Sequence, residues 1–237
     1  ISFFFIGRNS YKKLNFFEKL TLVILTYLLT SIFFSIPYYF SNYQITLIDS
    51  FFESISGLTL TGFSVFGNIK YFDPTLILWR SSSQWVGGLY FLIFLLLVFS
   101  NKQYDYKLIS FSYTPNINFS SEENLIKRII NISSVYIILT FSIFIILNFS
   151  NIRLFNSLNL SMTLISNGGF LPSNSLDLII KTFFQKSVLS ISLLISLLNI
   201  FILFNIFNPR KLINENQEDL LIIFLTLFIT FVLIITL

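Results

Sequence analysis

Long uncharged runs of hydrophobic residues, separated by short polar segments, dominate the pattern along this chain. Four of the runs come close to or exceed the roughly 18 residues with which a helix crosses the hydrocarbon core of a bilayer. These runs span residues 20–35, 129–152, 187–209 and 220–237. The pattern therefore predicts an all-helical chain with at least four membrane crossings.

Lysine and arginine gather in three clusters, which constrain how the chain threads the membrane. The clusters lie at residues 8–19, 102–128 and 210–211. Under the positive-inside rule all three face the cytoplasm, so an even number of crossings must separate each cluster from the next. Segments 18–40 and 75–100 supply two crossings for the first interval, and segments 129–150 and 187–207 supply two for the second.

Two glycine-bearing segments are left over by this count, and each must enter and leave the membrane on one side. The first, at 49–73, begins and ends with aspartate, and the second, at 154–175, contains Gly168 and Gly169. Irregular backbone at membrane depth persists only where protein buries it or a water-filled cavity hydrates it. Two re-entrant segments therefore predict a pore, and the alternative is a pair of external loops that carry interfacial helices.

The resulting organisation is a repeated unit of crossing helix, re-entrant pore loop and crossing helix. We expect a cytoplasmic lead-in at 1–16, a first repeat at 17–100, a cytoplasmic linker at 101–124, a second repeat at 125–208, and a linker with the first helix of a third repeat at 209–237. This gives a potassium-channel-like, all-α integral membrane fold with about five transmembrane helices and two pore loops. Because the chain begins at Ile1 and ends within an apolar run at Leu237, we expect it to be part of a longer protein.

The composition supports a membrane protein and argues against an enzyme. Of the 237 residues, 54% are hydrophobic and 11% are charged, and the mean hydropathy is +0.79. The sequence contains neither cysteine nor histidine, which excludes disulfides, thiolate nucleophiles, imidazole bases and the usual zinc ligands. We expect no cofactor, no metal beyond a transported ion and no nucleic-acid partner, since inside-positive loops account for the net charge of +4.

Each re-entrant segment can bring glycine to the end of a short helix. The candidate ion-filter residues are Thr61, Gly62 and Phe63 in the first segment, and Asn167, Gly168, Gly169 and Phe170 in the second. The partial negative charge at a helix C-terminus favours a cation, and carbonyls that line a narrow path call for backbone conformations that glycine adopts. One Gly-Phe pair alone is typical of a helix-capping turn. Two pairs at matched positions indicate a pseudo-symmetric transporter or channel.

One charge lies inside a predicted crossing helix. Arg80 needs a partner there, because an unpaired charge within a membrane is costly. We expect Glu53 on the preceding short helix to be this partner, with Asp49 as the second candidate, and we interpret the pair as a structural ion pair and not as an ion-binding site. In the same crossing helix, Gly87 and Gly88 predict a close contact between helices.

These residues carry a resemblance to a known family. The run at 49–63 reads DSFFESISGLTLTGF, and it is followed by Leu78-Trp79-Arg80 and Gln84-Trp85-Val86-Gly87-Gly88. This pattern resembles the first pore repeat of the Trk/Ktr potassium transporters, in the Trk/Ktr/HKT superfamily. The run Ile165-Ser166-Asn167-Gly168-Gly169-Phe170 is similar to the second filter segment of that family. The similarity extends from about Phe17 onward and departs from the usual pattern at Asn167 and at Leu171-Pro172.

The resemblance implies a function as well as a fold. It implies four repeats around one pore, of which this chain holds two and the start of a third, with Gly62 and Gly169 as filter glycines. The flanking carbonyls would come from Thr61, Phe63, Gly168 and Phe170. The implied activity is potassium uptake across the bacterial cytoplasmic (inner) membrane by a multi-pass homodimer, with a peripheral nucleotide-binding regulatory subunit on the cytoplasmic side and membrane lipid around it. A sodium-permeable or sodium-coupled relative and a non-conducting membrane scaffold are the alternatives.

Overall fold

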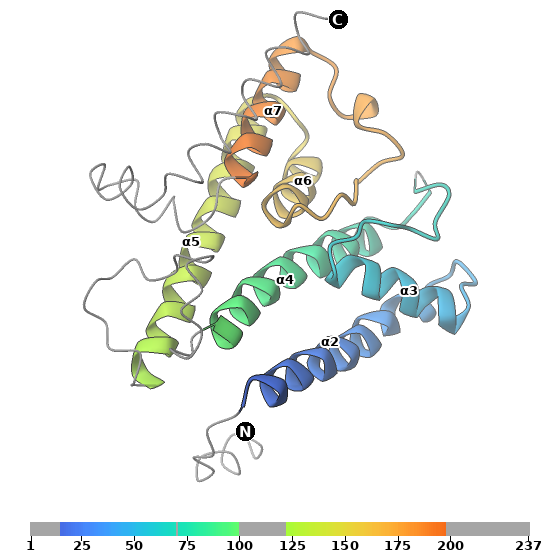
Figure 1. Cartoon of the computed structure of the whole chain (residues 1–237). Helices are drawn as coiled ribbons and strands as arrows, with labels where there is room; N and C mark the ends of the chain where they lie inside the picture. Colours follow the sequence, from blue (N-terminus) through green and yellow to red (C-terminus); the bar gives the residue numbers. More distant parts are fainter. Residues whose placement is uncertain (1–14, 70, 100–121, 198–237) are drawn as a thin grey trace, which may run out of the picture.

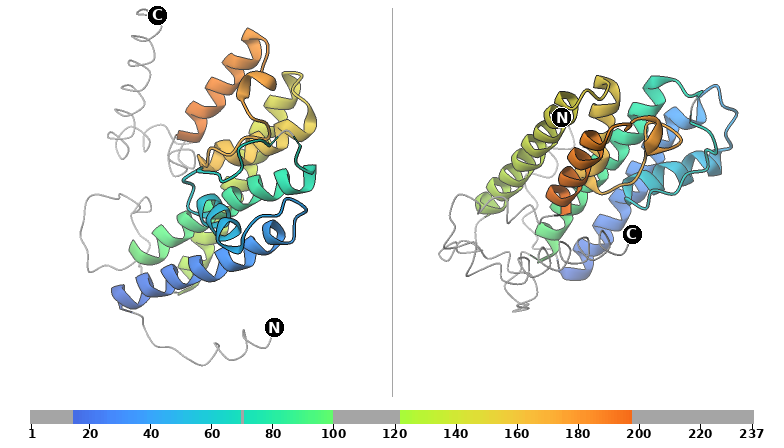
Figure 2. Two further views of the ribbon diagram at one scale, coloured as in Figure 1. Left: turned by 90° about the vertical axis from the view of Figure 1, so that its right-hand side faces the viewer. Right: turned by 90° about the horizontal axis from the view of Figure 1, so that it is seen from above.

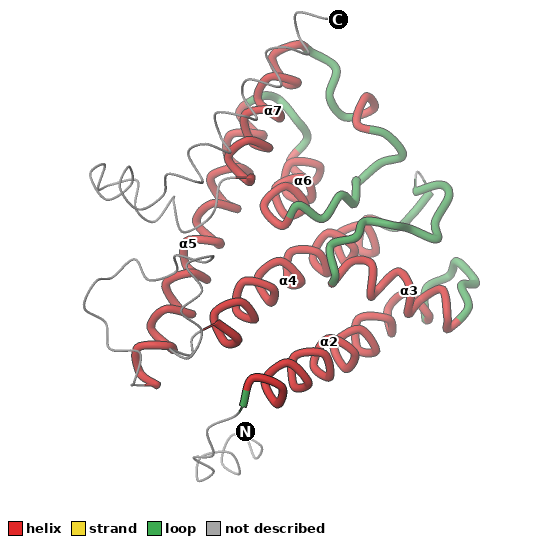
Figure 3. Tube along the Cα trace, viewed as in Figure 1, coloured by secondary structure: helices red, strands yellow, loops and turns green. Residues whose placement is uncertain are grey.

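The computed structural model describes residues 15–69, 71–99 and 122–197, and within these ranges every regular element is a helix (Figures 1 and 3). The all-helical expectation is therefore confirmed for the described part of the chain. The expected lead-in before residue 15, nearly all of the linker at 101–124 and the third-repeat segment at 209–237 lie outside the described residues.

The helices form two units with the same order of elements. In the first unit these are α2 (Phe16–Tyr39), α3 (Leu47–Leu58) and α4 (Pro74–Phe99). In the second unit these are α5 (Glu122–Phe149), α6 (Leu154–Ser166), the 3-10 turn η1 (Leu176–Leu178) and α7 (Phe183–Leu197). A long loop follows each of the short helices α3 and α6, as Figure 3 shows. This order matches the predicted succession of long helix, short helix, loop and long helix in the first unit; in the second unit the described part of the last helix, α7, is 15 residues long.

The lengths of the helices separate those that can cross a membrane from those that cannot. At 24 residues, α2 is about 36 Å long, whereas the 12 residues of α3 give only about 18 Å against a hydrocarbon core of about 30 Å. The segments 16–39 and 126–149 are each long and apolar enough to span a bilayer. Along α2, the buried residues Val23, Ser31 and Tyr38 form one stripe, and most of the other apolar side chains are exposed, as on a helix that faces lipid.

Helix α4 lies at the centre of the fold, between α2 and α3 on one side and α5 and α6 on the other (Figures 1 and 2). Two glycines allow the close approach on either side. A Cβ atom at Gly87 would collide with the backbone carbonyl of Leu58 at the end of α3. A Cβ atom at Gly88 would lie 2.7 Å from the hydroxyl of Tyr136 and 2.9 Å from Cβ of Ser166. The close helix contact predicted from these glycines is confirmed.

Hydrogen bonds and an apolar core join α4 to the second unit. The Trp85 indole donates to Oγ1 of Thr140 at 3.0 Å, and the Tyr136 hydroxyl donates to the backbone carbonyl of Trp85 at 3.0 Å. Around these bonds a buried cluster includes Ile143 and Leu147 of α5 together with residues of α6. The two units therefore meet along α4, α5 and α6.

We predict that Gly87→Ala destabilises the protein by about 1 to 3 kcal/mol, because the added methyl group forces α3 away from α4. The matched control is Gly67→Ala, since a Cβ at Gly67 meets nothing within 4 Å. Thermal denaturation of the detergent-solubilised protein, followed by loss of the monodisperse peak in size-exclusion chromatography, measures both variants. Equal melting temperatures for the two would contradict the close packing of α3 on α4.

Candidate functional site

The loops that follow α3 and α6 repeat the same backbone path at an interval of 107 residues. Leu60 and Asn167 both lie in the left-handed region, with φ of 63° and 55°. Two residues further on, Gly62 and Gly169 have φ of 72° and 84°. Such values favour glycine and, among other residues, asparagine. This explains why asparagine suits position 167, while Leu60 adopts a conformation that is costly for its side chain.

The hydrogen bonds that end the two short helices also correspond at this interval. The amide of Thr61 donates to the carbonyl of Ser56 at 3.1 Å, and the amide of Gly168 donates to the carbonyl of Thr163 at 3.0 Å. Both helices therefore stop in the same way, and both direct their C-terminal ends, with their partial negative charge, toward the glycines.

The two glycine segments converge although they are far apart in the sequence. A Cβ atom at Gly62 would lie 2.7 Å from the carbonyl oxygen of Gly168, and a Cβ atom at Gly169 would lie 4.0 Å from Cα of Gly62. Any side chain at either position would also be strained by its positive φ. The structure thus brings Gly62 and Gly169 together at the ends of two short helices.

The phenylalanines that follow the glycines have different surroundings. Phe63 is 70% exposed, whereas Phe170 is only 2% exposed and packs against the guanidinium of Arg80, with Cζ 4.3 Å from the ring centroid. The carbonyl of Phe63 accepts a hydrogen bond from Oγ of Ser56, and that hydroxyl in turn accepts from Oγ1 of Thr61 at 3.0 Å. The first segment is therefore tied to its own short helix.

Asn167 joins the second segment to the next helix, α7. Its side-chain oxygen accepts from Oγ of Ser196 at 3.2 Å, and its Nδ2 donates to the carbonyl of Ser196 at 3.4 Å. Ser196 lies in α7. This contact gives Asn167 a structural role in addition to its tolerance of the left-handed conformation.

The ion pair that the sequence predicts is present in the structure. Nε of Arg80 lies 2.8 Å from Oε1 of Glu53, and both side chains are almost completely buried. The Glu53 carboxylate also accepts from Oγ of Ser64 and from the amide of Val65, each at 3.0 Å. The pair therefore links α3, the loop after it and α4. Asp49, the second candidate, instead accepts a hydrogen bond from Oγ1 of Thr46 at the start of α3.

Gln84 contacts the second segment, a role that the sequence did not predict. Its Nε2 donates to the carbonyl of Gly168, and its Oε1 accepts from the amide of Phe170 at 3.0 Å. The sequence does contain a sign of this role, namely the position of Gln84. It follows Arg80 by four residues and so lies on the same face of α4. A polar amide one turn from a membrane-buried charge could have been recognised from the sequence.

The outer parts of the two loops also touch. Nδ2 of Asn174 donates to Oδ1 of Asn68 at 2.7 Å, and Oδ1 of Asn174 accepts from the amide of Ile69 at 2.7 Å. The two loops therefore contact each other both at the glycines and farther along the chain.

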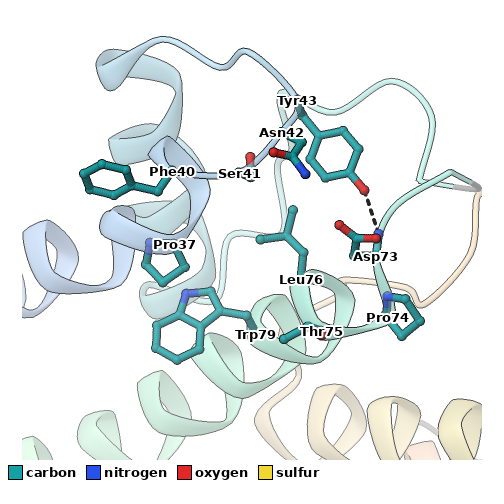
Figure 4. A pocket seen from close by; sticks show the side chains of 10 residues that line it. All are labelled: Pro37, Phe40, Ser41, Asn42, Tyr43, Asp73, Pro74, Thr75, Leu76 and Trp79. Atoms are coloured by element: carbon teal, nitrogen blue, oxygen red, sulfur yellow. Dashed lines mark hydrogen bonds between the residues drawn. The ribbon is translucent and has the colours of Figure 1, made fainter.

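A pocket of about 520 Å³ lies at the C-terminal end of α2 and the N-terminal end of α4, away from the glycines (Figure 4). Tyr43, Asp73 and Trp79 are among its lining residues. The backbone amide of Asp73 donates to the Tyr43 hydroxyl at 2.7 Å, the bond drawn as a dashed line in Figure 4. None of the candidate filter residues lines it. In the described residues, no group of three or more acidic, histidine or cysteine side chains could hold a metal ion.

We predict that Glu53→Gln destabilises the protein by about 3 to 5 kcal/mol, because it leaves the buried Arg80 charge without its counter-charge. The matched control on α3 is Asp49→Asn, which changes a carboxylate at the exposed start of the helix. Thermal denaturation in detergent measures the difference. Equal stability of Glu53→Gln and Asp49→Asn would show that the pair does not brace the loop.

Comparison with known proteins gives two relatives that are named as transporters. No family model matches the chain. The chain is 30% identical, over 164 residues, to an uncharacterised cation transporter of Methanocaldococcus jannaschii. The matched region covers 69% of this chain and 34% of the relative. The chain is 33% identical, over 72 residues, to the Trk system potassium uptake protein TrkI of Halomonas elongata, covering 30% of this chain and 15% of that protein. The chain therefore spans about a third or less of the length of these relatives.

The fold has a solved counterpart. The crystal structure of the potassium transporter TrkH from Vibrio parahaemolyticus matches this chain with a TM-score of 0.68 and 21% sequence identity. The match covers 86% of this chain and 41% of the TrkH chain. This match identifies the fold of a membrane transporter. Taken with the two relatives and with the paired glycine loops, it shows that the chain belongs to the Trk/Ktr-type potassium transporter family.

Proposed function

We propose that the chain forms part of a potassium-conducting path, in which backbone carbonyls around Gly62 and Gly169 replace the hydration shell of the ion. The observation that carries the proposal is the convergence of the two glycines at the C-terminal ends of α3 and α6. Carbonyls that substitute for water must approach one path from several sides. The two left-handed glycines at corresponding positions support such an approach from two sides.

The electrostatics of the short helices support a cation. Each C-terminal end carries about half a negative elementary charge. The buried cation Arg80 is already neutralised by Glu53, so its charge does not oppose a cation in the path. No covalent chemistry is required by this mechanism.

The surrounding assembly forms part of the same proposal. Phe63 and Gly169 are exposed in the described residues, and we propose that they face further repeats around one pore. The protein would be a multi-pass component of the bacterial cytoplasmic membrane, a homodimer, and the partner of a nucleotide-binding regulatory subunit on the cytoplasmic side. A sodium-permeable or sodium-coupled transporter, or a non-conducting scaffold, is the alternative that transport measurements distinguish.

We predict that Gly62→Ser and Gly169→Ser each lower rubidium uptake or reduce the preference for rubidium over sodium, because a side chain strains the left-handed backbone and narrows the path. Uptake of both ions into an uptake-deficient strain that expresses the intact protein, at matched membrane levels, is the measurement. Gly67→Ser is the control, since a Cβ there meets nothing within 4 Å.

Wild-type selectivity in both variants would mean that these glycines are turn residues only. Sodium uptake equal to or greater than rubidium uptake in the wild type would favour the sodium transporter, and no uptake of either ion would favour the scaffold.

We further predict that cysteines introduced at Asn68 and Asn174 are labelled by a membrane-impermeant maleimide from outside the cell. Both residues are exposed, and both lie in loops that must face away from the basic linker. The double variant should also form a disulfide under mild oxidation, because the two side chains are hydrogen-bonded to each other. Labelling of either cysteine only from the cytoplasmic side would contradict the re-entrant topology.

A further inference from the structure

The two glycine loops share one backbone path but are not held in the same way. The first loop is fixed by the Glu53–Arg80 pair, through bonds to Ser64 and Val65. At the position that corresponds to Glu53 in the short helix, 107 residues later, the second unit has Leu160. An apolar side chain cannot form an ion pair. The second loop therefore needs another group to fix its carbonyls and amides.

Gln84 supplies one bond on each side of Gly169. It extends from α4 of the first unit, is completely buried, and contacts Gly168 and Phe170 on either side of Gly169. One amide side chain offers a donor and an acceptor, and here Nε2 binds the Gly168 carbonyl while Oε1 binds the Phe170 amide. The peptide units on both sides of Gly169 are thereby fixed in direction.

The sequence of the loop is complementary to this side chain. The position that corresponds to Gly168 in the first loop is Thr61. A Cβ atom at Gly168 would overlap the side-chain amide of Gln84, with Nε2 at 2.7 Å. Glycine at 168 is therefore explained by the presence of Gln84 and not by its own φ, since among the glycines of the described residues only Gly62 and Gly169 have positive φ.

Arg80 completes the contact between the first unit and the second loop. Its guanidinium stacks on the ring of Phe170, with Cζ 4.3 Å from the ring centroid. Cation–π contacts of this kind are strongest where water is excluded, and Arg80 and Phe170 are 1% and 2% exposed. Two residues one turn apart on α4 thus hold the same segment, Arg80 by the ring and Gln84 by the backbone.

We propose that Gln84 is the positioning residue of the second filter segment: its amide turns the Gly168 carbonyl into the protein and, by accepting from the Phe170 amide of the next peptide unit, sets the direction of the Gly169 carbonyl along the ion path. This inference rests on the proposed function, because it concerns ion selection at the same site. Gln84 touches the filter backbone and not the ion. Its removal should therefore alter discrimination between ions more than it alters the amount of folded protein.

The first experiment compares Gln84→Leu with Thr140→Val in the intact protein. Leucine keeps most of the volume of glutamine but leaves the Gly168 carbonyl and the Phe170 amide unpaired. Thr140→Val also removes an inter-unit hydrogen bond of α4, the one from Trp85, yet it does not touch the filter. Rubidium uptake kinetics with increasing sodium as competitor, at matched membrane levels, give the ratio of the apparent affinities for the two ions.

We expect Gln84→Leu to lower the rubidium-over-sodium affinity ratio by roughly tenfold, the factor that corresponds to about one hydrogen bond. Thr140→Val should keep the wild-type ratio, even if both variants lose similar thermal stability. An unchanged ratio in Gln84→Leu, or an equal change in Thr140→Val, would overturn the inference.

A second variant keeps the test decisive if Gln84→Leu does not reach the membrane. Gly168→Ala should displace the Gln84 amide and change the ratio in the same direction. The double variant Gly168→Ala/Gln84→Ala should be no worse than Gly168→Ala alone, because both changes break the same contact. Fully additive losses would refute the inference while the proposed function stands. A wild-type protein that carries neither ion would refute the proposed function, and the inference with it.

Discussion

The buried ion pair between Glu53 and Arg80 is the interaction on which the first loop depends. A charge inside a membrane protein is tolerated only when a counter-charge and further hydrogen bonds compensate for lost hydration. Here the Glu53 carboxylate accepts hydrogen bonds from Arg80, from Ser64 and from the amide of Val65. The same carboxylate therefore neutralises the arginine of α4 and fixes the geometry of the loop.

Helix α4 transmits that geometry to the second unit. Its small residues let it approach α3 through Gly87 and α6 through Gly88, so that side chains on one helix reach both loops. Arg80 contacts Glu53 on one side and the Phe170 ring on the other. Close packing is thus a condition for the convergence of the glycines, because a separation of even one methyl group would break these short contacts.

The parts of the fold that depend on local sequence could be predicted, and those that depend on packing could not. Lipid penalises isolated charges and irregular backbone so strongly that the long helices, the two loops and the Glu53–Arg80 partnership follow from the sequence. The contacts of Gln84 with Gly168 and of Asn167 with Ser196 join separate elements at a precise register. Sequence patterns indicate that such amides need partners, but the partner is set by the angle and depth at which the helices pack.

The different supports of the two loops have a consequence for the order in which the protein is made. Near its glycine, the first loop is fixed by residues that lie between Glu53 and Arg80, so this part of the loop can acquire its shape once α4 has been synthesised and inserted. The second loop takes its bonds from Gln84 on that same helix, about 85 residues earlier in the chain. We therefore expect a direction in biogenesis, since these bonds of the second loop can form only after α4 is in place.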